Sequence, residues 1–225
     1  MKHEMERVSR PRRKARESYN AMSRWYDLFT SSEKRFTDIG MQMLDVQPGE
    51  SILEIGCGTG HALSKFTKSG GIVTAIDLSD GMLEVAHRQT KNQTVGFCQA
   101  DGLSLPFPSR QFDAVFTSFT LELFDTPDMP RVLNECRRVL KVDGRIGVVS
   151  LAKQETTAVR IYEWFHRQMP KFVDCRPIFL QSILMEFGFT IQQSTIKTMW
   201  GLPVEIVLAT KTGLLSEGRN DINPI

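Results

Sequence analysis

The sequence predicts an α/β domain with a Rossmann-like, mostly parallel sheet of seven strands, an antiparallel C-terminal hairpin and helices on both faces. Three observations lead to this prediction. Short apolar segments alternate with amphipathic segments between residues 51 and 151, as in parallel sheets with crossover helices. The first apolar segment runs directly into a glycine-rich turn. Two strand-like segments near the C-terminus are separated only by residues 200–203, which favours a hairpin.

The expected elements follow one another in a regular order. Gly70 and Gly71 end the first helix, Ser79 is a suitable N-cap for the second, and Asp143-Gly144 forms a turn before the fifth strand. The strands are expected at 51–56, 72–77, 95–101, 112–119, 145–151, 190–199 and 204–210. After the N-terminal segment, the helices are expected at 60–69, 79–89, around 133–140, 156–168 and 178–187.

The length of 225 residues fits one domain with a single core, extended by a segment at each end. Residues 1–43 are expected to form a helical arm that packs over the ligand edge of the sheet and acts as a lid. Residues 44–211 would be the α/β domain itself. Residues 212–225 are mostly polar and are expected to form a loose tail.

Composition and charge exclude several functional classes. The chain is 41% hydrophobic and 24% charged, which is ordinary for a soluble protein. No apolar run approaches the roughly 20 residues of a membrane span, and the N-terminus lacks the apolar region of a secretory signal. The four cysteines contain no C-x-x-C pair and the four histidines are scattered, so spacing indicates no metal site. A cytoplasmic protein with reduced thiols is expected.

Basic side chains are concentrated near the N-terminus, although the net charge is only +2. Six cationic residues lie between Arg7 and Arg16. Such a cluster suits peripheral contact with anionic membrane lipid or with an acidic partner, and a solvated terminus is the simpler interpretation. The small net charge argues against nucleic acid as a partner. The sequence does not indicate an oligomeric state.

The strongest functional signal is the segment Glu54–Gly60, EIGCGTG, at the end of the first predicted strand. Its glycines, Gly56, Gly58 and Gly60, allow a ligand to approach the backbone without interference from a Cβ atom. A dinucleotide fingerprint would have its last glycine where this chain has His61. The pattern therefore departs from NAD-binding proteins and fits a ligand without pyrophosphate, whose carboxylate the amides at the helix start can hold.

Polar residues follow the three neighbouring strands at the same edge of the sheet. Asp77 ends the second strand, where a carboxylate can accept hydrogen bonds from both ribose hydroxyls. The segment Asp101-Gly102-Leu103 follows the third strand, where the acid can accept from an adenine amino group and an amide can donate to a ring nitrogen. Ser118 lies near the end of the fourth strand. A helix N-cap, an Asp-Gly turn and a solvent-facing strand end are the ordinary alternatives.

Taken together, these segments resemble the class I S-adenosylmethionine-dependent methyltransferases. The similarity is to the subgroup of ubiquinone and menaquinone C-methyltransferases and bacterial phosphatidylethanolamine N-methyltransferases. It runs from about Tyr19 to Lys211, and it departs from the family at Val142-Asp143-Gly144, a turn that is usually Pro-Gly-Gly. The segments that carry it are ILEIGCGTG (52–60), AIDLSDGMLEVA (75–86), QADGLSLPFPSRQFDAVF (99–116) and RRVLKVDGRI (137–146).

The resemblance implies that residues 44–211 form a methyltransferase domain with S-adenosylmethionine as methyl donor and S-adenosylhomocysteine as product. Glu54 and the glycines would border the methionine part of the cofactor. Asp77 would hold the ribose, and Leu78 and Met82 would lie against the adenine. Packing in the helix core is an equally good explanation of Met82.

The same resemblance assigns the remaining positions. Asp101 and Gly102 would read the adenine edge, and Ser118 would line the cofactor near the methyl donor. Tyr19 and Tyr26 fall in the segment that often folds over the cofactor in such enzymes. Surface anchoring of a helix is the alternative role of these two tyrosines.

Methyl transfer is an in-line displacement in which positive charge disperses, so the site must supply alignment and a dry pocket more than acid or base. A general base is required only if the acceptor atom must lose a proton. Candidates for this base are Tyr26, Glu122 and His166. Glu122 is expected either on the rim where an acceptor would lie or at a helix start facing water.

The predicted function is methyl transfer to a small molecule, with a quinone-like ring, a lipid amine and other metabolites all open as acceptors. Aromatic residues between 155 and 203 suit a flat or lipophilic acceptor, and they also suit a core under a cap. The alternative is a non-catalytic adenosyl-ligand-binding or scaffold protein on the same fold. The intact glycines and acids favour the enzyme.

Overall fold

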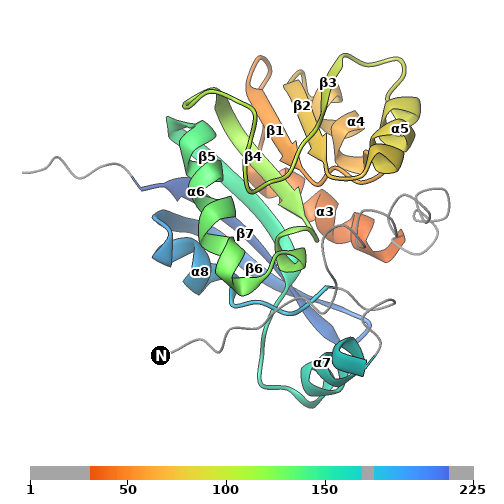
Figure 1. The fold of residues 1–225 in the computed structure, drawn as a ribbon, viewed down its shortest axis with the longest axis vertical. Coiled ribbons are helices and arrows are strands. Elements are labelled where there is room, and N and C mark those ends of the chain that lie inside the picture. The colour runs from red at the N-terminus through yellow and green to blue at the C-terminus, as the bar shows by residue number, and fades with distance from the viewer. Residues whose placement is uncertain (1–30, 169–174, 213–225) are drawn as a thin grey trace, which may run out of the picture.

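The structure, a computed structural model, describes residues 31–168 and 175–212. Its sheet has seven strands in the order β3-β2-β1-β4-β5-β7-β6 (Figure 1). The first five strands pair in parallel, and β7 is antiparallel to both of its neighbours. The fold class predicted from the sequence is confirmed. The strands are β1 (Ser51–Ile55), β2 (Ile72–Asp77), β3 (Val95–Gln99), β4 (Phe112–Ser118), β5 (Leu140–Leu151), β6 (Phe189–Met199) and β7 (Leu202–Lys211).

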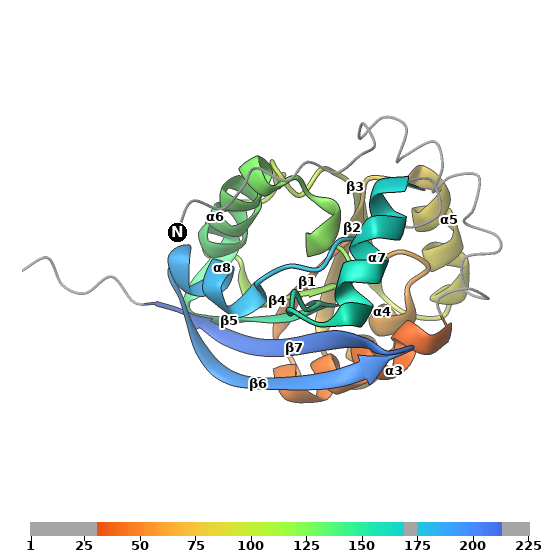
Figure 2. The same ribbon diagram turned by 90° about the horizontal axis from the view of Figure 1, so that it is seen from below.

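Helices cover both faces of the sheet, and each face has its own hydrophobic cluster. One cluster includes side chains of α3 (Ser31–Leu44), α4 (His61–Lys68) and α5 (Asp80–Gln89). The other includes side chains of α6 (Met129–Val139) and α8 (Leu180–Glu186). Figure 2 shows α3 on the opposite side of the sheet from α6 and α8. No helix of the described residues is long and apolar enough to cross a membrane.

Most of helix α3 packs on a face of the sheet, and only its first turns reach the ligand edge, where the sequence led us to expect the N-terminal segment. Phe36 and Leu44 are buried in the cluster on that face. Gly40 allows the close approach, because a Cβ there would lie 2.6 Å from Cγ2 of Val149 on β5. Helix α3 is therefore part of the core of the sheet domain. Residues 1–30 of the expected arm lie outside the described residues.

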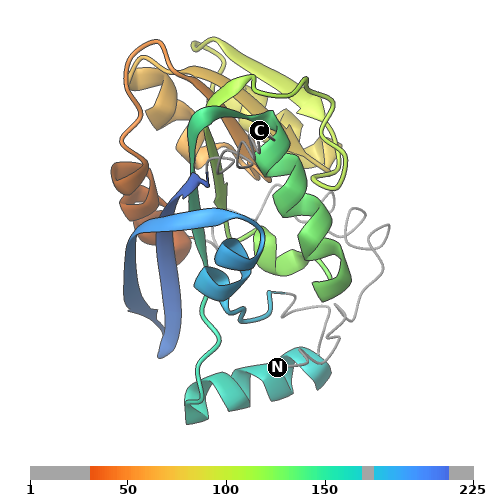
Figure 3. The same cartoon turned by 90° about the vertical axis from the view of Figure 1, so that its left-hand side faces the viewer.

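The connections at the carboxyl ends of β4 and β5 depart most from a simple alternation of strands and helices. Two short 3₁₀ helices, η1 (Leu121–Leu123) and η2 (Thr126–Asp128), follow β4. They were not expected, since three residues carry no periodicity. After β5, α7 (Thr157–Gln168) lies beyond the carboxyl ends of the strands (Figure 3).

Local sequence signals place most element boundaries correctly, with one difference at β5. Ser79 caps α5 as predicted, because its Oγ accepts a hydrogen bond from the amide of Met82 at 3.1 Å. Strand β5 begins at Leu140, before the expected turn at Asp143-Gly144. Its pairing with β4 shifts register after Leu140 and resumes at Arg145, so the turn residues lie in a bulge.

Candidate functional site

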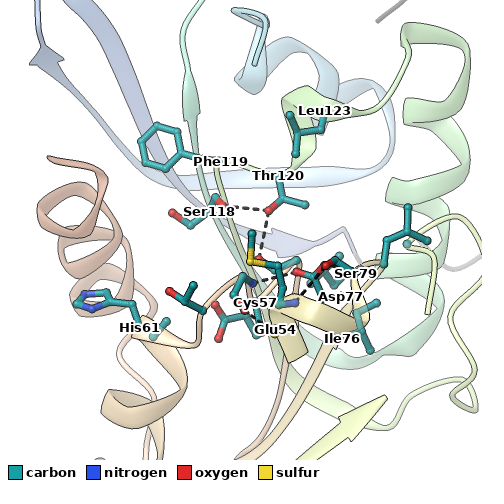
Figure 4. A pocket seen from close by; sticks show the side chains of 18 of the residues that line it. Glu54, Cys57, His61, Ile76, Asp77, Ser79, Ser118, Phe119, Thr120 and Leu123 are labelled. Carbon is teal, nitrogen blue, oxygen red and sulfur yellow. Dashed lines mark hydrogen bonds between the residues drawn. The ribbon is translucent and has the colours of Figure 1, made fainter. Parts of the chain in front are cut away.

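A pocket of about 190 Å³ opens at the carboxyl ends of β1, β2 and β4. Strands β2 and β3 lie on one side of β1 and strand β4 lies on the other, so the order in which strands are added to the sheet reverses here. The crevice at such a reversal is where ligands bind to open α/β sheets. Figure 4 shows acidic Glu54 and Asp77 on one side of the pocket and apolar Phe119 and Leu123 on the other. The predicted cofactor residues that line it are Glu54, Gly56, Gly58, Asp77, Leu78, Met82, Asp101, Gly102 and Ser118.

The glycine loop after β1 is fixed against β2 by backbone hydrogen bonds. The amides of Gly56 and Cys57 donate to the carbonyl oxygen of Ile76 at 2.9 Å and 3.1 Å. Gly56 has a φ of +70°, and a Cβ at this position would collide with Thr120. Gly58 also has a positive φ, of +51°, but nothing lies within 4 Å of the position of its Cβ. The missing side chain of Gly58 therefore leaves open space beside the pocket.

Asp77 is already hydrogen-bonded to the protein through both carboxylate oxygens. Oδ2 accepts from the amide of Gly58 at 3.0 Å, and Oδ1 accepts from the amide of Ser79 at 2.9 Å. Burial raises the pKa of Asp77, while the hydrogen bonds from these amides lower it. A carboxylate has about four lone-pair sites, so two remain for the hydroxyls of a ribose.

Glu54, near the end of β1, is the residue whose surroundings most clearly indicate that the pocket binds a ligand. Its side chain is only 4% exposed, and its Oε2 has no hydrogen-bond partner among the described residues. Burial raises the pKa of Glu54 well above its usual value, and the charge of Asp77 raises it further. Buried polar atoms without partners are costly, and a cationic group such as the ammonium of a methionine moiety would supply the missing donor.

Two predicted cofactor residues do not line the pocket. Gly60, with a φ of +87°, lies where α4 packs against α5, since a Cβ there would lie 3.0 Å from Cβ of Ala86. Leu103 is buried in the hydrophobic cluster under α6, although its amide donates to Oδ1 of Asp101 at 3.0 Å. These two positions support the site from outside it. Gly102 faces the pocket and packs against the ring of Phe124.

The two candidate bases that the structure describes, Glu122 and His166, do not line the pocket. Glu122 is fully buried, and its Oε1 accepts a hydrogen bond from the amide of Leu151 at 3.2 Å. The expectation that it lies on the rim or faces water is therefore wrong. His166 is buried on α7 and is not among the lining residues. Tyr19 and Tyr26 lie outside the described residues.

Two groups of lining residues were missed by the sequence analysis. The segment after β4 could have been found, because β4 neighbours β1 at the reversal of strand order. The first turns of α3 carry no local sequence signal for a ligand site. Packing brings them there, since Thr37 Oγ1 lies 2.8 Å from Ser118 Oγ at the end of β4. The missed residues of these two groups are Phe119, Thr120, Leu123 and Phe124 after β4 and Glu33, Lys34 and Thr37 of α3; Cys57 and His61, beside the glycines, also line the pocket.

Comparisons with known proteins agree with this geometry. A family model described as a methyltransferase domain matches residues 53–148. A demethylmenaquinone methyltransferase of Thermotoga maritima is 32% identical over 70% of this chain and 68% of its own length. The chain belongs to the class I S-adenosylmethionine-dependent methyltransferases. A second relative of this family, the demethylmenaquinone methyltransferase of Lactobacillus johnsonii, is 29% identical over 68% of this chain and 65% of its own length.

A solved structure of the methyltransferase fold extends the similarity to most of the chain. Magnesium protoporphyrin IX methyltransferase from Synechocystis PCC 6803, solved with bound S-adenosylhomocysteine, superposes with a TM-score of 0.72 at 16% identity. The match covers 90% of this chain and all of that one. This likeness concerns the fold. The cofactor of the methyltransferase family is S-adenosylmethionine, and the unpartnered Glu54, the carboxylate of Asp77 and the open space at Gly58 all fit it.

Proposed function

We propose that this protein transfers a methyl group from S-adenosylmethionine to a small, lipophilic acceptor with a quinone-like ring. The observation that carries the proposal is the convergence of the glycine loop, Glu54 and Asp77 on one pocket at the reversal of strand order. The acceptor class is supported by relatives named demethylmenaquinone methyltransferases. The chain spans about two thirds of the length of these relatives.

In this proposal, different residues of the chain bind different parts of the cofactor. The bound cofactor supplies an electrophilic methyl group on a sulfonium. Asp77 holds the ribose, and Glu54 offers its unpartnered oxygen to the cationic end of the ligand. Asp101 and Gly102 lie at the third strand, where the adenine edge would be read. These contacts orient the donor, and alignment is the main requirement of an in-line displacement.

The wall opposite the acidic groups suits an apolar acceptor. Phe119, Leu123 and Phe124 line the pocket there, and Phe119 is only 6% exposed. Apolar side chains at the reaction centre exclude water and leave a flat ring in contact with hydrocarbon and aromatic surfaces. A lipid amine is the second acceptor class to test, because Glu33 also lines the pocket and a carboxylate there would attract a cation.

The decisive experiment offers labelled S-adenosylmethionine together with demethylmenaquinone, under reducing and non-reducing conditions, or with phosphatidylethanolamine. We expect mass spectrometry to show one added methyl group on the quinone-type acceptor. Asp77→Ala is the matched variant that should form much less of this product at limiting cofactor while remaining folded. Binding of S-adenosylhomocysteine without methylation of either acceptor would contradict the acceptor class. Absence of any binding would contradict the donor.

The proposal includes a cytoplasmic location and peripheral contact with membranes. The support is the basic segment 7–16, whose six cationic side chains would be attracted to anionic lipid. Sedimentation with vesicles tests this directly. We expect more protein to pellet with anionic vesicles than with zwitterionic ones, and less to pellet as salt is raised. Equal pelleting with both vesicle types would rule the contact out.

A further inference from the structure

The segment Phe119–Phe124 forms one wall of the pocket and touches the cofactor loops at two points. Thr120 occupies the space that a side chain at Gly56 would need, and its hydroxyl donates to the carbonyl oxygen of Ser118 at 3.0 Å. Phe124 lies against Gly102, where a Cβ would be 3.0 Å from its Cζ. A shift of this wall would therefore disturb both the methionine side and the adenine side of the site.

Two ionisable side chains, Glu122 and Arg176, hold this wall on the side away from the pocket. Glu122 lies within the wall segment but points away from the pocket, and its Oε1 accepts from the amide of Leu151 at the end of β5. Arg176, which is 7% exposed, donates from Nη2 to the carbonyl oxygen of Phe124 at 2.7 Å. The wall is thus tied both to the sheet and to the segment that follows α7.

The carboxyl group of Glu122 makes only part of the hydrogen bonds that it could make in this arrangement. Its Oε2 is buried and has no hydrogen-bond partner within the described part of the chain. An ionised carboxylate in such a place demands further donors, whereas a protonated one tolerates the environment better. Two charged groups act on Glu122 from neighbouring elements, Glu33 of α3 and Arg176. Arg176 is the cation of this pair, so an ionised Glu122 would compete for it with the carbonyl of Phe124.

We propose that Glu122 and Arg176 are positioning residues that hold the wall Phe119–Phe124 in its cofactor-binding arrangement while Glu122 is protonated. Ionisation of Glu122 draws Arg176 away from Phe124 and loosens the wall. This inference rests on the proposed function only in requiring that the adenosyl ligand binds in this pocket. It makes cofactor binding sensitive to a proton that the methyl transfer itself does not use.

The size of the effect follows from the titration of Glu122. Its pKa is raised to about 8 by all its surroundings together: burial raises it most, the charge of Glu33 also raises it, and backbone hydrogen bonds and the charge of Arg176 lower it. With that pKa, the protonated fraction falls from roughly nine tenths at pH 7 to roughly one tenth at pH 9. Apparent affinity scales with the fraction of molecules in the binding-competent state. The affinity for the adenosyl ligand should therefore fall about tenfold over this range.

The test is calorimetry with S-adenosylhomocysteine between pH 7 and pH 9, comparing the full chain with Glu122→Gln. Gln keeps the hydrogen bond from Leu151 and cannot ionise. We expect the wild-type affinity to fall about tenfold more than that of Glu122→Gln. The comparison also cancels the titration of the ligand's own amino group and of Glu54 and Asp77. Circular dichroism at each pH shows that both proteins remain folded.

Two further variants should change the pH dependence in different ways. Arg176→Met removes the donor to Phe124 whose withdrawal is the proposed effect, so its affinity should already be low at pH 7 and should fall no more toward pH 9 than that of Glu122→Gln. Glu33→Gln removes a charge that raises the pKa of Glu122, so the midpoint of the pH dependence should fall. Glu186→Gln, an exposed acid on α8, is the control and should leave the midpoint unchanged. A purely structural role for these residues would not lower the midpoint in Glu33→Gln or remove the pH dependence in Arg176→Met.

The outcomes are distinguishable from those of the proposed function, because no acceptor is present. An identical pH dependence in wild type and Glu122→Gln overturns the positioning role and leaves the methyltransferase proposal intact. A pH dependence like that of the wild type in Arg176→Met, or an unchanged midpoint in Glu33→Gln, overturns it as well. Absence of binding at every pH overturns both proposals. Flattened profiles in Glu122→Gln and Arg176→Met, together with a lower midpoint in Glu33→Gln, support the inference.

Discussion

The carboxylate of Asp77 accepts a hydrogen bond from the backbone amide of Gly58 at 3.0 Å. This contact ties the end of β2 to the glycine loop after β1, so the two parts of the site are held together before a ligand arrives. Capping of α5 is the task of Ser79, whose Oγ accepts from Met82. Asp77 is thereby available both to order the loop and to bind a ribose.

Replacing Asp77 by Ala should weaken binding of S-adenosylhomocysteine by about 1.5–3 kcal/mol, the range for hydrogen bonds to charged groups. Asp77→Asn should lie between Ala and wild type, since it keeps one acceptor oxygen. Calorimetry measures the affinities, and circular dichroism checks the fold. Asp143→Ala, an exposed acid in the β5 bulge, is the control. Unchanged affinity in a folded Asp77→Ala protein would remove this residue from the site.

Gly58→Val should abolish cofactor binding, because the branched side chain would enter space that the structure leaves open beside the pocket. Gly49→Val offers a matched control. Gly49 also has a positive φ and nothing within 4 Å of its Cβ position, and it does not line the pocket. Both variants should lose about 1–2 kcal/mol of stability through backbone strain. Only Gly58→Val should lose binding in calorimetry, and equal affinity in the two would contradict the assignment.

The part of the site assigned to the methyl donor, S-adenosylmethionine, could be predicted from the sequence because its sequence signals are local. Strand β1, the glycines and Glu54 are consecutive in the chain, and Asp77 ends the next strand. Apolar strands that end in glycine or acid place such groups at one edge of a parallel sheet. The function of each position then follows from the chemistry of its side chain.

The opposite side could not be predicted because it depends on contacts between distant segments. Thr37 and Ser118 meet across 81 positions of the sequence. The burial of Glu122 depends on a three-residue 3₁₀ helix, whose length gives no periodic signal, and on the end of β5 packing beside it. An acid after a strand suggests a solvent-facing rim in sequence terms, and only the packing of η1 reverses that expectation.

The stability of the protein should depend on pH through Glu122. Its pKa is raised from 4.5 to about 8 in the folded state, so between these values the folded chain binds a proton that the unfolded chain has lost. The free energy of unfolding therefore falls as pH rises over this range, by on the order of 1 kcal/mol per pH unit at most. Urea unfolding of wild type and Glu122→Gln at several pH values measures this contribution.

Glu122→Gln should remove that part of the pH dependence, since Gln does not titrate. The variant should gain stability relative to wild type as pH rises from 5 to 8, with no further relative gain above pH 8. Glu186→Gln should follow the wild-type curve, because this acid is exposed. Parallel curves for wild type and Glu122→Gln would show that Glu122 does not carry a raised pKa.

Two truncations should distinguish the role of residues 1–30 from that of helix α3. Removing residues 1–43 would take away most of α3, which buries Phe36 and approaches β5 closely at Gly40. We expect this protein to unfold or to lose several kcal/mol of unfolding free energy, since a face of the sheet would be exposed.

Removing only residues 1–30 leaves α3 in place, so the fold should survive. If the arm acts as a lid that carries Tyr26, activity should fall much more than stability. Full activity of the 31–225 protein, with unchanged affinity for S-adenosylhomocysteine, would rule out a lid in the first 30 residues.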